Sequence, residues 1–158
     1  MKIPLFKFYN TAIITVLFTL FLNSTLYGHC EIPCGIYGDS LRIAMIKEHI
    51  GTVEKSMKQI NLLSQESTIN YNQLVRWVTN KEEHAKKIQD IVSQYFLHQR
   101  IKLTDSNNEM NDKYITNLTL LHRLLVYSMK AKQSTDLEAI DKLNETVSSF
   151  EESYFHQH

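Results

Sequence analysis

The segment SLRIAMIKEHIGTVEKSMKQINLLSQ, residues 40–65, sets the helical character of this chain. Its apolar side chains recur at spacings of mostly three and four residues, which places them on one face of an α-helix. That face carries Ile43, Ile46, Ile50, Val53, Met57, Ile60 and Leu63. We expect Asp39 or Ser40 to cap this helix, because side-chain oxygens at its start accept hydrogen bonds from free amides. The pattern predicts an amphipathic helix that buries one face.

Downstream of Asp39 the chain contains a single glycine, Gly51, and no proline, so few residues there interrupt helices. A second helix is predicted to begin near Ser67. Its buried side is expected to carry Leu74, Trp77, Val78, Ala85, Ile88, Ile91, Val92, Tyr95 and Phe96. The charged residues 81–83 are expected to form an exposed face of this helix.

The polar residues 104–108 end this pattern and separate the second helix from a third. The third helix is expected to bury Tyr114, Leu118, Leu121, Leu125 and Ser128. Thr135 and Glu138 have the spacing of a capping box, so a fourth helix is predicted to start there. It is expected to bury Leu137, Ile140, Leu143, Val147 and Phe150, whereas residues 154–158 are expected to fray. Four helices with short connections favour an all-α, up-down-up-down four-helix bundle over residues 39–158.

Residues 1–28 have the form of a secretory signal, with Lys2 and Lys7, an apolar run at 11–22, and a short polar stretch before Gly28. The apolar run is shorter than the about 20 residues that a membrane-spanning helix needs. We therefore expect a leader that is cleaved after Gly28, and a retained anchor is the alternative. The mature chain would be one domain, exported to the periplasm or secreted, without stable membrane association.

The chain carries 17 basic and 17 acidic residues, so its formal net charge is zero. A protein that binds nucleic acid through its phosphates normally shows an excess of basic residues on one face or segment. The composition therefore argues against nucleic acid as a partner.

The segment HCEIPCGIYG, residues 29–38, contains both cysteines of the chain. Cleavage after Gly28 would give His29 a free α-amine, close to its own imidazole and to the thiols of Cys30 and Cys34. Nitrogen and thiolate sulfur are suitable ligands for a late transition metal. An ordinary disulfide between the cysteines is the alternative, although such a small loop removes little chain entropy. We call residues 29–38 the hook.

The hook resembles that of nickel-containing superoxide dismutases, whose mature chains begin with His-Cys, two residues, Pro-Cys-Gly, one residue and Tyr. The similarity extends to Arg76-Trp77 and to the segment KEEHA at residues 81–85. It implies an antioxidant enzyme that converts superoxide to dioxygen and hydrogen peroxide by Ni(II)/Ni(III) cycling. It also implies a homohexamer with one nickel ion per subunit.

The resemblance further implies a role for individual hook residues. The α-amine of His29, the amide nitrogen and sulfur of Cys30, and the sulfur of Cys34 would be the planar ligands. The His29 imidazole would be the axial ligand, and Tyr37 would guard the open face. The sequence departs from the family at Glu31, where aspartate is common.

In some family members a glutamate of the first helix and an arginine of the second orient the axial histidine. The approximate counterparts here are Ala44 or Met45 and His84, so the partner of His29 is unassigned. We expect the helical histidines to be solvated or hydrogen-bonded; these are His49, His84, His98 and His122.

Two other functions fit the same sequence. One is an exported nickel or copper carrier that binds metal in the hook without redox turnover. The other is an exported helical interaction protein in which Cys30 and Cys34 form a disulfide. Superoxide consumption by the nickel-loaded protein separates the enzyme from both.

Overall fold

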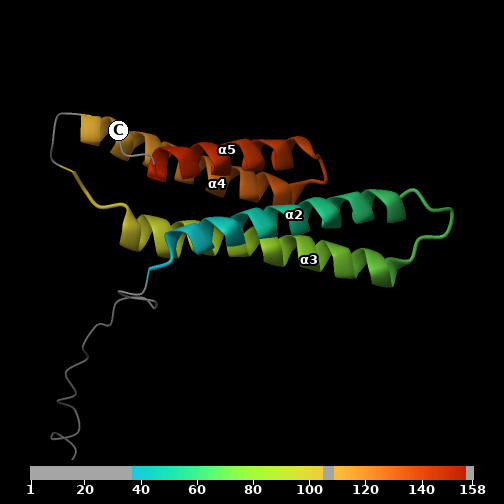
Figure 1. Ribbon diagram of the computed structural model, residues 1–158. Helices are drawn as coiled ribbons and strands as arrows, with labels where there is room; N and C mark the ends of the chain where they lie inside the picture. Colours follow the sequence, from blue (N-terminus) through green and yellow to red (C-terminus); the bar gives the residue numbers. More distant parts are fainter. Residues whose placement is uncertain (1–36, 105–108, 156–158) are drawn as a thin grey trace, which may run out of the picture. The chain divides into compact units, whose positions relative to one another are not determined.

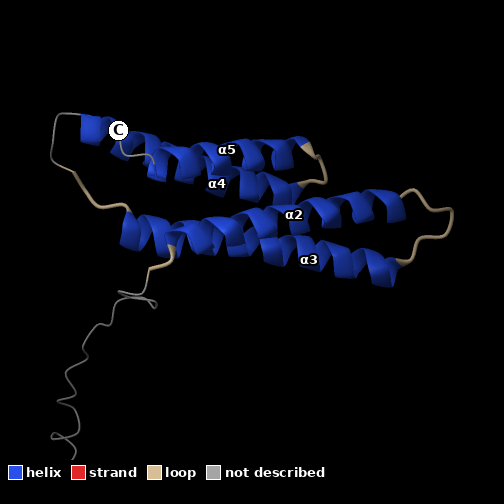
Figure 2. Ribbon diagram, in the orientation of Figure 1, coloured by secondary structure: helices blue, strands red, loops and turns tan. Residues whose placement is uncertain are grey.

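Helices account for nearly all of the chain that the computed structural model describes, which is residues 37–104 and 109–155. Within these ranges there are four α-helices and no strand (Figures 1 and 2). The predicted leader and hook residues 29–36 lie outside the described residues. The elements are α2 (Asp39–Leu63), α3 (Tyr71–Asp90), the π-helix η1 (Ile91–Arg100), α4 (Glu109–Gln133) and α5 (Glu138–Phe155). The predicted all-α fold is therefore confirmed.

The helices form a bundle in which α2 packs along α3 and α4 packs along α5 (Figure 1). Further contacts join α3 to α4 and α2 to α5. The apolar face predicted from residues 40–65 lines the core: Ile43, Ile46, Ile50, Val53 and Met57 are fully buried, and Ile60 is nearly so. Periodicity alone thus identified the buried face of α2.

The core of the other helices follows the predicted pattern in part: some of the predicted residues are buried, others, such as Leu74, Trp77 and Tyr114, are only half-buried, and one is exposed. The predicted residues that are buried are Ala85, Ile88, Val92, Tyr95, Phe96, Leu121, Ser128, Ile140, Leu143, Val147 and Phe150. Val78, which was predicted to be buried, is 39% exposed. Lys81 of α3 contacts the C-terminus of α4. The residues of α3 that precede Lys81 therefore extend beyond the end of α4. Val78 therefore lacks a neighbour on α4 to cover it.

Helix starts differ from the predictions at three places. α2 begins at Asp39 after Gly38, and no side chain caps it. α3 begins at Tyr71 rather than near Ser67, where the Asn70 side chain accepts a hydrogen bond of 3.2 Å from the Gln73 amide. The predicted capping box at Thr135 is wrong. α5 begins at Glu138, and the Asp136 carboxylate accepts a hydrogen bond of 3.0 Å from the Glu138 amide.

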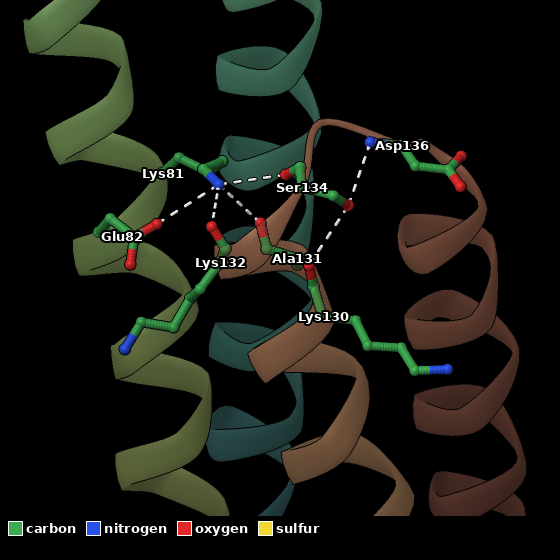
Figure 3. A network of polar contacts seen from close by, with 7 residues as sticks. All are labelled: Lys81, Glu82, Lys130, Ala131, Lys132, Ser134 and Asp136. Atoms are coloured by element: carbon green, nitrogen blue, oxygen red, sulfur yellow. Dashed lines mark hydrogen bonds and ion pairs between the residues drawn. The ribbon is translucent and has the colours of Figure 1, made fainter.

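The buried Lys81 explains how α4 ends (Figure 3). Its ammonium donates hydrogen bonds to the carbonyls of Ala131 at 2.9 Å, Ser134 at 3.1 Å and Lys132. The last carbonyls of a helix have no partner within it and carry a partial negative charge, so a cation is favourable there. Lys81 is only 4% exposed, so the prediction of a solvated face was wrong for this residue.

The second predicted helix continues through Phe96, but residues 91–100 adopt π-helical geometry. At its end the Ile101 amide donates a hydrogen bond of 2.9 Å to the Phe96 carbonyl, five residues back. In an α-helix, residues five apart point about 140° away from each other. In a π-helix they become neighbours, because its hydrogen bonds join residues five apart. This geometry places Tyr95 and Arg100 on one side of η1.

Candidate functional site

Tyr37 is the predicted site residue that lies within the described residues. His29, Cys30 and Cys34 lie outside them, so the predicted ligand set stays a prediction. The structure instead describes the place where the hook joins α2. Three elements meet there: the start of α2, the end of η1 and the end of α5.

The Tyr37 ring lies against two side chains of η1. The Arg100 guanidinium carbon is 4.2 Å from the centroid of the Tyr37 ring, which is a cation–π distance. The Tyr95 ring meets it edge-on, with centroids 6.3 Å apart and an interplanar angle of 68°. Tyr37 is 47% exposed, so its ring is supported on one side and open to solvent on another.

Asp39 is the centre of a polar network at the first turn of α2. One carboxylate oxygen accepts hydrogen bonds from the Tyr95 hydroxyl at 2.5 Å and from Arg100 Nε at 2.8 Å. The other accepts from Arg100 Nη2 at 2.7 Å and from the Tyr154 hydroxyl at 2.8 Å. Two-point contact between guanidinium and carboxylate is among the strongest polar contacts in proteins. We call Asp39, Tyr95, Arg100 and Tyr154 the Asp39 network.

The network also holds the backbone that follows the hook. The Gly38 amide donates a hydrogen bond of 2.8 Å to the Tyr95 hydroxyl, which itself donates to Asp39. The Arg42 guanidinium lies 5.1 Å from the centroid of the Tyr95 ring. Tyr95 thus connects the last hook residue to the first residue of α2.

The hydrogen bonds of the network fix its charges. Burial raises the pKa of Asp39, but hydrogen bonds from Arg100, Tyr95 and Tyr154 outweigh this effect and bring it below the ordinary value. Burial, with the hydrogen bond to Asp39, raises the pKa of Tyr95 and brings that of Tyr154 to about 12. The hydrogen bond to Asp39 raises the pKa of Arg100. At neutral pH the carboxylate and guanidinium are therefore charged, and both tyrosines are neutral donors.

Sequence reasoning missed these residues as members of one site. Asp39 was predicted to cap α2, but its carboxylate contacts other elements instead. Tyr154 was predicted to lie in a fraying tail, but α5 extends to Phe155 and Tyr154 is half-buried. The sequence holds one local hint of this site, which is the spacing of five residues between Tyr95 and Arg100. Residues at this spacing become neighbours in a π-helix but not in an α-helix.

The approximate counterparts of the family's orienting residues take different partners here. The Met45 sulfur accepts a hydrogen bond of 3.7 Å from Arg42, and Ala44 is exposed. His84 contacts His49 of α2, with 3.2 Å between their Nδ1 atoms. His49, His84 and His98 all have polar partners, as expected for helical histidines.

Within residues 37–104 and 109–155, no group of three or more His, Cys, Asp and Glu side chains is placed to hold a metal ion. No helix in these ranges is long and apolar enough to cross a membrane. The imidazole of His29 and the two thiols of the hook fit nickel, and so would the α-amine of His29 if the chain is cut after Gly28, because thiolate and nitrogen ligands suit the square-planar divalent ion.

Comparison with known proteins gives one result that covers both the hook and the bundle. The family model for nickel-containing superoxide dismutase matches residues 24–158. No curated protein and no solved structure was found to match the chain. The matched range includes the hook, the Asp39 network and every helix described above, so this chain belongs to the nickel-containing superoxide dismutase family.

Proposed function

We propose that this superoxide dismutase acts through nickel held by His29, Cys30 and Cys34, after residues 1–28 have been removed. Family membership establishes the enzyme class, the nickel cofactor and superoxide as the substrate. The observation that carries the residue assignment is the hook sequence itself, which places both cysteines beside the predicted new N-terminus. The reaction takes two superoxide ions. One gives up an electron and becomes dioxygen, and the other takes up that electron with two protons and becomes hydrogen peroxide.

The chain supplies the donor atoms. Cys30 offers a thiolate and its own amide nitrogen, Cys34 a second thiolate, and His29 an amine and an imidazole. Nickel bound by these donors supplies one-electron chemistry by cycling between Ni(II) and Ni(III), since soft, strongly donating ligands stabilise the oxidised ion. The amine is available only when no residue precedes His29, so processing and activity are coupled.

The described residues support the hook at its C-terminal end. Three residues of extended chain span at most about 11 Å, so Cys34 stays within that reach of Tyr37. The Gly38 amide is bonded to Tyr95 and the Tyr37 ring lies on Arg100, which fixes this end of the hook to the bundle. Tyr37 controls access to the site: its half-exposed ring can exclude larger anions, and a phenol oxygen is a poorer nickel ligand than a thiolate sulfur.

Three further properties belong to the proposal. The bundle has up-down-up-down topology, which the pairing of α2 with α3 and of α4 with α5 supports. The chain is exported, as the leader sequence indicates. It forms a homohexamer, in which subunits cover apolar side chains that are exposed in a single chain. These include Leu41, Leu62, Tyr71, Val75, Ile115 and Met129.

The test compares the protein that begins at His29 with a form that retains Gly28. We expect nickel at one ion per chain and superoxide consumption in the first form, and loss of dismutation in the second. The variants Cys30→Ser and Cys34→Ser should lose both nickel and dismutation, because an alcohol is not deprotonated at neutral pH. Nickel binding without superoxide consumption would favour the carrier function. An active form that retains Gly28 would contradict the role of the α-amine.

A further inference from the structure

His49 of α2 and His84 of α3 form a close pair across two packed helices. Their Nδ1 atoms are 3.2 Å apart, and their rings meet edge-on with centroids 4.9 Å apart. Both side chains are half-buried, so solvent still reaches the pair. His49 follows Asp39 by ten residues, which is about 15 Å along α2. The pair is therefore separate from the Asp39 network.

The charged groups that face the pair come from both helices. Burial lowers the pKa of His49, and His84 and Lys87 lower it further, whereas Glu48 raises it. Burial and the charge of Lys87 lower the pKa of His84, whereas Glu83 and Glu48 raise it by a smaller amount. Both pKa values lie below the ordinary value for histidine. At neutral pH both imidazoles are therefore neutral, which is the form that binds metal ions.

We propose that His49 and His84 form a second metal site, a two-histidine clamp for a late first-row divalent cation such as Zn²⁺. Zinc binds imidazole nitrogen at about 2.0–2.1 Å in tetrahedral geometry, which puts two ligand nitrogens about 3.3 Å apart. The observed separation of 3.2 Å matches that spacing. Two half-buried imidazoles on packed helices are thus already held at the distance that one ion requires.

Metal binding to this pair requires little movement of the two imidazole rings. Without metal, one Nδ1 atom donates a hydrogen to the other. With metal, both Nδ1 lone pairs bind the ion and each ring carries its hydrogen on Nε2, which is an ordinary tautomer. Water completes the coordination, and the exposed Glu48 and Glu83 add negative charge close by, against the positive charge of Lys87. The site uses no residue of the hook.

The experiment uses the full chain with Cys30→Ser and Cys34→Ser, so that the hook cannot hold metal through its thiolates. Zinc chloride is titrated at neutral pH and heat is recorded. We expect one zinc ion per chain. His49→Gln and His84→Gln should each weaken binding by about tenfold or more, because even the loss of a group that supports a ligand costs 10–100-fold. His122→Gln, at an exposed position of α4, is the matched control and should leave the affinity unchanged.

Unchanged zinc affinity in both His49→Gln and His84→Gln would overturn the proposal, and so would a chain that binds no zinc at millimolar concentration. If either variant fails to fold, ¹⁵N-labelled histidine in the unsubstituted pair gives a second measurement. Zinc should then shift the Nδ1 resonances of these two rings, and unshifted resonances would contradict the clamp. Because the hook is inactivated throughout, this outcome is independent of the nickel assignment.

Discussion

The substitution Asp39→Asn tests the network at the base of the hook. It keeps the size of the side chain but removes the charge and an acceptor for Arg100, which is 24% exposed. Breaking a fully buried ion pair from one side costs 3–5 kcal/mol, and the partial exposure of this pair reduces the expected cost to about 2–3 kcal/mol. For a domain of this size, the melting temperature should fall by roughly 6–12 °C. Thermal unfolding followed by circular dichroism measures this change.

The loss of stability caused by Asp39→Asn should depend on pH, and the pKa of Asp39 gives the direction. The pKa of Asp39 is lower in the folded chain than in the unfolded one, so its stabilisation is fully present above the unfolded value. It is lost as the pH falls through the folded value. The gap in melting temperature between the native protein and Asp39→Asn should therefore narrow below about pH 4.

Asp90→Asn is the matched control, because Asp90 is paired with Lys86 at 2.6 Å but both side chains are at least half exposed. It should cost about 0.5 kcal/mol or less. Equal destabilisation by the two substitutions would refute the network as a main anchor. The network would also be refuted if the difference in melting temperature between the native protein and Asp39→Asn stayed constant as the Asp39 carboxylate is protonated.

Three further substitutions test other parts of the molecule. Tyr37→Phe should retain nickel and much of the dismutation rate, with stronger inhibition by azide; loss of nickel, measured by metal analysis, would make the hydroxyl structural. Lys81→Ala should lower the free energy of unfolding in urea by about 2–3 kcal/mol, because it removes the donor from the carbonyls at the end of α4, where the contact with Ala131 is buried and the other two are part-buried. Tyr154→Phe should lower stability at neutral pH. Since the Tyr154 pKa is raised to about 12, this difference should fade as the pH rises through that value, as equilibrium unfolding at several pH values will show.

The apolar periodicity of the sequence was a good guide to the core. Ile43, Ile46 and Ile50 are fully buried as their spacing predicts, because burial of apolar area dominates the folding of an amphipathic helix. The ends of helices were predicted less well. Asp39 is a good capping residue by local rules, but its carboxylate is used by Arg100 and two tyrosines from distant elements.

Other features depend on contacts that local patterns do not contain. Lys81 is buried because the end of α4 supplies three carbonyl acceptors, and nothing near residue 81 signals this. The π-helical geometry of η1 is likewise invisible in a pattern that fits an α-helix through Phe96. The hook is the reverse case: its metal ligands were predicted from residue types and from the family resemblance and stay a prediction, whereas its support by Tyr95 and Arg100 became visible only in the folded arrangement.

The hydrogen bond between Asp39 and Tyr154 joins residues 115 positions apart. A chain is synthesised from its N-terminus, and contacts between distant segments form only after both have emerged. Asp39 is therefore made long before Tyr95, Arg100 and Tyr154, the three side chains that bind its carboxylate. The attachment point of the hook is completed only when the last turn of α5 has folded, so a ribosome-bound chain that still lacks residue 154 carries the hook without its finished anchor.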